Sequence, residues 1–181
     1  QAYRLVIRPR TPDFRVVAVP ERGYSGVLLR KGGQLPIQLV AFRRNGFNEE
    51  IRVTAANLPA GVTAAEVTIG PGMTSTLMEL RCAADAAPAT GQFTLITEST
   101  VNGESVSRPG RFATINWAGN PQQGNNVGNT PVSRLTSALA IAISSLENEI
   151  IGLELGDGSV VEAPRAQNVK FTYKRRGEFK G

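Results

Sequence analysis

The chain has 181 residues, of which 41% are hydrophobic and 19% charged, and its lysines and arginines exceed its carboxylates to leave a formal charge of +5. It contains no histidine and a single cysteine, Cys82, which excludes Ser–His and Cys–His nucleophile pairs, imidazole metal ligands and an internal disulfide. The basic residues are scattered rather than gathered in one run, so we expect no nucleic-acid partner. No apolar run reaches the ~18 residues of a membrane-spanning helix.

The first twelve residues combine a short strand signal with proline. Large apolar residues alternate with others from Tyr3 to Ile7, and Pro9 and Pro12 follow. Alternation favours a strand, and the prolines favour a linker after it. We therefore predict that residues 1–12 are the last strand of an upstream module plus a linker, with any targeting sequence further upstream.

From residue 14 to residue 117, turn signals such as Asn45-Gly46 come at short intervals and long helical periodicity is absent. The segments predicted as strands are 14–19, 26–30, 34–42, 50–56, 66–69, 74–82, 92–98 and 105–117. Seven or more short strands in about 105 residues are typical of an immunoglobulin-like β-sandwich, which we predict for residues 13–118. The core is expected to contain Ile37, Leu39, Ile51, Val53, Leu80, Phe93 and Leu95.

Residues 119–131 are rich in Asn, Gly and Gln and predict a flexible linker. Beyond it, Leu139, Ile141 and Ile143 alternate with alanines, which favours a strand, although the leucine spacing over 134–149 leaves a helix as the alternative. Further strands are predicted at 151–155, 160–162 and 168–174.

One stretch of the chain recurs about a module length later. Ile37–Phe47 has three alternating apolar positions, then Arg-Arg, a glycine-containing turn and a phenylalanine, and Val169–Phe179 repeats this order at an offset of 132 residues. A repeat of this length is a whole sandwich module. We therefore predict that residues 132–181 are the N-terminal part of a second β-sandwich. Half a sandwich leaves an apolar face and a free edge, so this part should pack against other modules of the polypeptide, against another chain, or back onto the first module.

Several segments together resemble a known class of protein. They are "YRLVIRP", "PDFRVVAVP", "FRRNGF", "NLPAGV", "AADAAPATGQF" and "VEAPRAQNVKFTYKRRGEFKG". They are similar to modules of large secreted bacterial proteins, notably planctomycetal ones, in which domains similar to the bacterial pre-peptidase C-terminal domain alternate with immunoglobulin-like repeats. The resemblance implies an immunoglobulin-like module over residues 14–117 after the end of an upstream one, and it brings no catalytic residues.

The reactive side chains give no enzyme motif. Glu49 and Glu50 are adjacent, so on a strand they point to opposite faces, and the three aspartates are far apart and outside any calcium-loop pattern. Cys82 shares the alternating register of Met78 and Leu80, which indicates a buried thiol. We therefore predict no catalytic, cofactor-binding or metal-binding residue and no cofactor.

Candidate interaction residues are aromatic side chains and arginines near strand ends. Strand-end arginines at a turn are usually a solvated rim, but beside aromatic residues they can also bind an anionic polymer, and a tryptophan at a strand end packs at a module junction or stacks on a sugar. The candidates are Phe171, Tyr173, Arg175, Arg176 and Trp117.

These observations favour a non-catalytic structural or interaction module of a multidomain protein that is extracellular, at the cell surface or periplasmic. Its work would be spacing, adhesion or assembly. A carbohydrate-binding accessory module of a secreted hydrolase is the main alternative, with a glycan as partner, although aromatic residues make up only 6% of the chain. A fragment of an enzyme whose active site lies elsewhere is a third.

Overall fold

The computed structural model describes residues 10–21, 24–116, 132–147, 151–155 and 171–175. Within these ranges the chain forms β-strands and turns and no α-helix, so the all-β prediction is confirmed. The strands are β1 (Asp13–Val19), β2 (Gly26–Lys31), β3 (Gln34–Arg44), β4 (Ile51–Ala56), β5 (Val62–Ala64), β6 (Val67–Ile69), β7 (Ser75–Cys82), β8 (Ala89–Val101), β9 (Glu104–Pro109), β10 (Arg111–Asn116), β11 (Val132–Thr136), β12 (Leu139–Glu147), β13 (Ile151–Leu155) and β14 (Phe171–Arg175).

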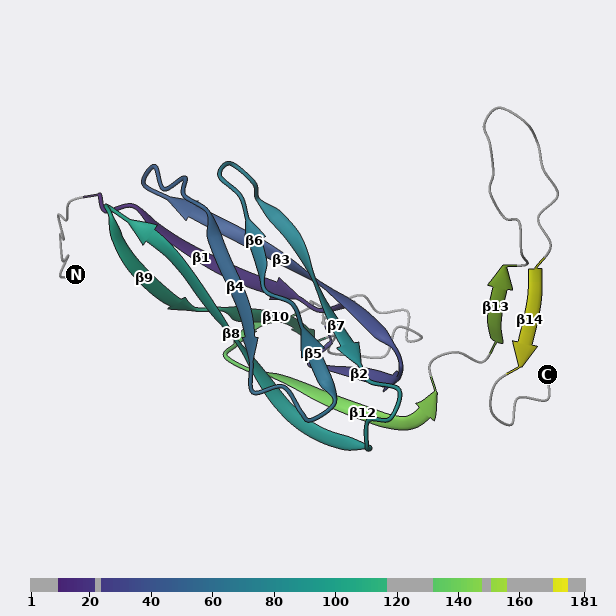
Figure 1. The fold of residues 1–181 in the computed structure, drawn as a ribbon. Helices are drawn as coiled ribbons and strands as arrows, with labels where there is room; N and C mark the ends of the chain where they lie inside the picture. Colours follow the sequence, from purple (N-terminus) through teal and green to yellow (C-terminus); the bar gives the residue numbers. More distant parts are fainter. Residues whose placement is uncertain (1–9, 22–23, 117–131, 148–150, 156–170, 176–181) are drawn as a thin grey trace, which may run out of the picture.

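Two curled sheets face each other to form the sandwich (Figure 1). The first sheet has the strand order β11-β10-β1-β3-β7-β5, and the second has the order β2-β12-β8-β4-β6, with β9 paired to β8. Both sheets are mixed, because β1 pairs parallel to β10 and β2 pairs parallel to β12. We call the first one the β1 sheet and the second one the β8 sheet.

The Asn-Gly dipeptides make the turns that their chemistry predicts. Asn102 and Gly103 both have positive φ, 53° and 85°, and join β8 to β9 in a two-residue hairpin that pairs Val101 with Glu104. Both positions of such a turn require positive φ, which asparagine and glycine tolerate best. Asn45 and Gly46, also at positive φ, form the turn that ends β3, after which the chain crosses to β4 of the other sheet.

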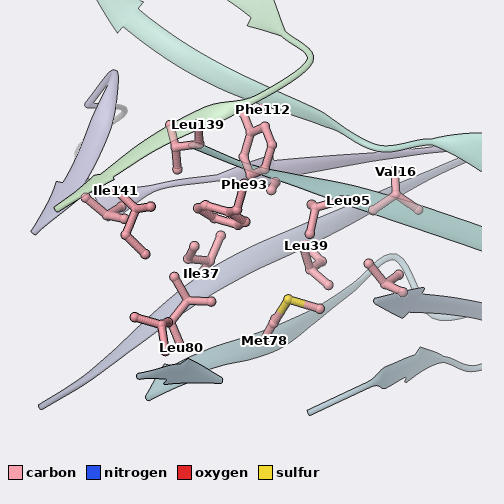
Figure 2. Close-up of a cluster of buried hydrophobic side chains, with 14 of the residues drawn as sticks. Val16, Ile37, Leu39, Met78, Leu80, Phe93, Leu95, Phe112, Leu139 and Ile141 are labelled. Atoms are coloured by element: carbon pink, nitrogen blue, oxygen red, sulfur yellow. The ribbon is translucent and has the colours of Figure 1, made fainter. Parts of the chain in front are cut away.

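Alternate residues of the facing strands fill the core between the sheets. Figure 2 shows Phe93 of β8 among Phe112, Leu139 and Ile37, and the rings of Phe93 and Phe112 meet edge to face at 5.1 Å. All seven residues predicted for the core are buried, with at most 2% of their surface exposed. Burial of such side chains contributes about 1.5–3 kcal/mol for each large one.

The predicted strand 105–117 is in fact two strands that belong to different sheets. β9 pairs with β8, whereas β10 pairs with β1 and β11. The chain crosses at Gly110, whose N–H donates to the Leu95 carbonyl at 2.8 Å and at which an added Cβ would lie 2.6 Å from the Leu95 Cβ. The crossing therefore needs a residue without a side chain, a requirement that alternation does not reveal.

Residues 132–147 belong to this same sandwich, so the predicted boundary at residue 118 and the assignment of this segment to a second module are wrong. β11 pairs antiparallel to β10, and β12 lies between β2 and β8. Leu139, Ile141 and Ile143 of β12 are buried in the common core. The segment folds back because β9 leaves the edge of β8 at Gly110, and β12 pairs with β8 beyond that point. The strand prediction for this region is confirmed, and the helix alternative is wrong.

The last two strands form an antiparallel pair of their own, in which Ile151 lies opposite Arg175 and Leu155 lies opposite Phe171. Among the described strands, neither β13 nor β14 pairs with any other. The predicted strands at 3–7 and 160–162 and the predicted linker at 119–131 lie outside the described residues.

Candidate interaction surfaces

Two of the five candidate residues from the sequence, Trp117 and Arg176, lie outside the described part of the chain. The other three lie on β14, for which the structure gives the backbone pairing: Phe171, Tyr173 and Arg175 occupy alternate positions along one strand. Their roles as interaction residues therefore stay predictions.

The pairing of β13 with β14 matches the pairing of β1 with β3 position by position. In the sandwich the pairs are Phe14↔Arg43, Val16↔Ala41 and Ala18↔Leu39. In the second pair they are Ile151↔Arg175, Leu153↔Tyr173 and Leu155↔Phe171. Each apolar residue of β1 that is buried in the sandwich corresponds to an isoleucine or leucine of β13, and the arginine falls at the same place. The sequence repeat relates β3 to β14 at an offset of 132 residues, and the backbone pairing then relates β1 to β13 at an offset of 137 residues.

Arg43, the residue that corresponds to Arg175, is not a solvated rim residue. Its guanidinium donates to the carbonyl oxygens of Glu49 (2.6 Å), Gly70 (2.7 Å), Met73 (3.2 Å) and Ile69 (3.4 Å), and its Cζ lies 5.4 Å from the centre of the Phe47 ring. Desolvation by burial lowers the pKa of Arg43. Arg43 therefore holds together the two turns that follow β3 and β6, whereas the neighbouring Arg44 is exposed.

The strand crossing at Gly110 produces a cleft of about 220 Å³ on the β1 side of the molecule. Its walls carry one carboxylate, three arginines and several apolar residues, which are Asp13, Arg15, Val16, Val17, Arg108, Pro109, Arg111 and Leu135. The Arg108 Nε lies 3.2 Å from the Asp13 carboxylate, which ties β9 to the start of β1. We call this site the arginine cleft.

Two of the cleft arginines have no partner within the described residues. No hydrogen bond or ion pair reaches the guanidinium of Arg15 or of Arg111 in this part of the chain, and both residues are exposed. Since Asp13 already lies beside Arg108, Arg15 and Arg111 leave an excess of positive charge in the cleft. A guanidinium in this state presents a fork of donors suited to a carboxylate, sulfate or phosphate.

The outer face of the β1 sheet carries large exposed apolar side chains. Leu135 of β11, Phe42 of β3 and Leu77 of β7 are 64%, 51% and 62% exposed, and Phe42 lies opposite Arg15 in the register of β1 with β3. Arginines and aromatic residues with few lysines are the composition of protein–protein interfaces.

The remaining reactive side chains considered in the sequence, a cysteine and two adjacent glutamates, lie outside the arginine cleft. Cys82 is a buried free thiol, as its register indicated. Glu49 and Glu50 line a shallow cleft with Arg52 and Glu98. In the described ranges, no three His, Cys, Asp or Glu side chains come together in a way that could hold a metal ion.

Within the same ranges there is no helix long and apolar enough to span a membrane. No known family model matches the chain, and no curated protein matches it either.

Proposed function

We propose that this chain is a non-catalytic structural and interaction module of a multidomain extracellular or cell-surface bacterial protein, in which β-sandwich modules follow one another. Its function would be spacing, adhesion or assembly. The observation that carries the proposal is the equality of register between β1–β3 and β13–β14. A sandwich followed by the opening strand pair of another sandwich is the organisation of a tandem repeat.

The burial pattern supports the same proposal. Apolar residues of both sheets close one continuous core within the described chain, from Phe14 in β1 to Ile143 in β12. On the outer face of the β1 sheet, the large and exposed Phe42, Leu77 and Leu135 accompany two arginines without partners among the described residues. An outer face of this kind is suited to contact another macromolecule.

A carbohydrate-binding module would need a different kind of surface. A sugar platform uses exposed aromatic rings that stack on the sugar, and among the described residues Tyr24 and Phe42 are the large aromatic side chains that are exposed. Tyr24 lies just before strand β2 and Phe42 lies on strand β3, and these strands belong to different sheets. This arrangement offers single rings rather than a row of them.

A glycan array with the full 181-residue chain separates the two functions. We expect no saturable binding to any glycan, and the same result for Phe42→Ala and Tyr24→Ala. Saturable binding that is lost in Phe42→Ala or Tyr24→Ala, and retained in the matched variant Leu77→Ala, would contradict the structural function and favour the carbohydrate-binding one.

A further inference from the structure

The charges of this chain are separated along the sequence. Between Arg134 and Arg165 there are five carboxylates and no lysine or arginine, although the chain as a whole carries +5. Four of these carboxylates fall within twelve residues, at Glu147, Glu149, Glu154 and Asp157. We call residues 146–157 the acidic segment. It carries no positive charge of its own that could neutralise these carboxylates.

The acidic segment also contains apolar residues. Leu146, which precedes Glu147 at the end of β12, is 60% exposed, and the sequence continues with isoleucines and leucines between the carboxylates. Glu154 occupies the register position that corresponds to Val17, the β1 residue between the buried Val16 and Ala18. The segment therefore combines the two kinds of group, carboxylate and aliphatic, that complement the arginine cleft and its apolar surroundings.

We propose that the arginine cleft binds the acidic segment of a second copy of this chain. Arg15 and Arg111 receive its carboxylates, and the exposed Leu135 packs against its aliphatic side chains. The cleft is lined by the first five residues of β1, Asp13 to Val17, except the buried Phe14, whereas β12, whose last two residues begin the acidic segment, runs to the other end of the sandwich (Figure 1). The cleft of one copy and the acidic segment of another are two different parts of the chain, so their contact is heterologous and joins copies head to tail.

The chemistry favours a protein segment over the other anionic ligands. The cleft is smaller than the roughly 300–1,000 Å³ of pockets that enclose a drug-sized ligand, so it accommodates a charged group with a short stem rather than a whole molecule. Two guanidinium groups near the exposed Leu135 and Phe42 match a carboxylate carried by an apolar peptide. This inference rests on the proposed function, since it names the partner through which the modules assemble.

Mixing two complementary variants tests the contact. The cleft variant carries Arg15→Gln and Arg111→Gln and keeps the acidic segment. The segment variant carries Glu147→Gln, Glu149→Gln, Glu154→Gln and Asp157→Asn and keeps the cleft. In sedimentation velocity at low salt, we expect the wild-type chain to self-associate, each variant alone to stay monomeric, and an equimolar mixture to form dimers but no longer species. Only one functional half remains on each variant, so the mixture has one pairing to make.

A second experiment measures the affinity of the cleft for the acidic segment. The probe is a fluorescent peptide of residues 146–157 added to the full chain, with fluorescence anisotropy as the readout. We expect the cleft variant to bind about tenfold more weakly than wild type, and binding to weaken as salt is raised from low to physiological concentration. The matched control, Arg30→Gln with Arg52→Gln, removes the same charge from β2 and β4 in the other sheet and should bind like wild type.

Three results would overturn the proposal. They are a wild-type chain that stays monomeric at all concentrations, a segment variant that still associates by itself, and a control variant that loses as much peptide binding as the cleft variant. Binding of a polyuronate but not of the peptide would also overturn it, in favour of an acidic glycan. The glycan array tests the proposed function independently of this contact. If the array shows no binding and the mixed variants do not associate, only the proposed contact is wrong. If the array shows saturable sugar binding, the proposed structural function is wrong.

Discussion

The strand pairs β1–β3 and β13–β14 have the same register but different neighbours. β3 also pairs with β7, and β1 also pairs with β10, so the first pair lies in the middle of a six-stranded sheet. Among the described strands, the second pair has no further strand on either side. Equal local pairing therefore does not fix the neighbours of a strand pair: burial of a sheet face requires a second layer, which the β8 sheet supplies for β1 and β3.

The same comparison applies to the arginine that follows each pair. Arg43 is fixed by four carbonyl groups, of which three belong to residues 69, 70 and 73, well after β3 in the sequence. Arg175 occupies the matching register position in β14. An arginine at the end of such a strand is thus a structural residue where later turns surround it, and sequence alone does not distinguish this state from a solvated one.

The largest expected effect comes from shortening the chain. A chain that ends at residue 131 loses β11 and β12, and with them the buried Leu139, Ile141 and Ile143, each of which contributes about 1.5–3 kcal/mol. Because natural domains are stable by roughly 5–15 kcal/mol, we expect it to lose cooperative unfolding. A chain that ends at residue 147 should retain it. Urea unfolding followed by circular dichroism measures both, and equal midpoints would show that β11 and β12 are dispensable.

Next in size is a matched pair of core substitutions. Leu39→Ala should lower the free energy of unfolding of the sandwich by about 2–5 kcal/mol, because Leu39 is fully buried. Phe171→Ala changes the corresponding position of β14 and should alter the sandwich transition by less than about 0.5 kcal/mol. Urea titrations of both variants provide the measurement. A comparable loss in Phe171→Ala would mean that β14 packs on the sandwich.

Replacement of the two matching arginines gives a smaller difference. Arg43→Lys should cost about 1–3 kcal/mol, because one ammonium group cannot bond the carbonyls of Glu49, Gly70 and Met73 together. Arg44→Lys and Arg175→Lys should each stay within about 0.5 kcal/mol. Amide hydrogen exchange at the turn residues 70–73 provides a local readout, since it should accelerate in Arg43→Lys alone. Unchanged exchange in that variant would contradict the structural role.

The smallest effect is expected at the start of β1. Asp13 pairs with Arg108 of β9 on a partly exposed site, so Asp13→Asn should cost only about 0.2–1 kcal/mol, and less at high salt. Glu104→Gln, an exposed residue of β9, is the control. In the sequence that leads into β13, the residue that corresponds to Asp13 is Ile150, which carries no charge. An effect of Asp13→Asn that persists in molar salt would mean that the ion pair is not its origin.

Most strands were predictable because they depend on local pattern. Alternation identified β1, β2, β3, β4, β7 and the inward positions of β8, and the Asn-Gly dipeptides placed the end of β3 and the β8–β9 hairpin. β5 was missed because its three residues are too few for alternation to register. The break at Gly110 was missed because it depends on contact with Leu95, fifteen residues earlier in the chain.

The arginine cleft could not be predicted from the sequence. Asp13, Arg15, Arg108, Arg111 and Leu135 come from four strands spread over more than 120 residues, and no spacing links them. Their meeting depends on which sheet β10 joins. A basic overall charge indicated that an anionic partner was compatible with the chain, but it located no site.

The sequence by itself determined the class of fold, the positions that face the core and the recurrence of the 37–47 pattern at 169–179, because each follows from alternation and turn chemistry within a few residues. Only the tertiary structure decided that residues 132–147 close the first sandwich, that Arg43 bonds distant carbonyl groups and that Arg15 and Arg111 share a cleft. The physical reason is that strand pairing between distant segments is set by which edges and apolar faces are left uncovered when all the strands are packed together.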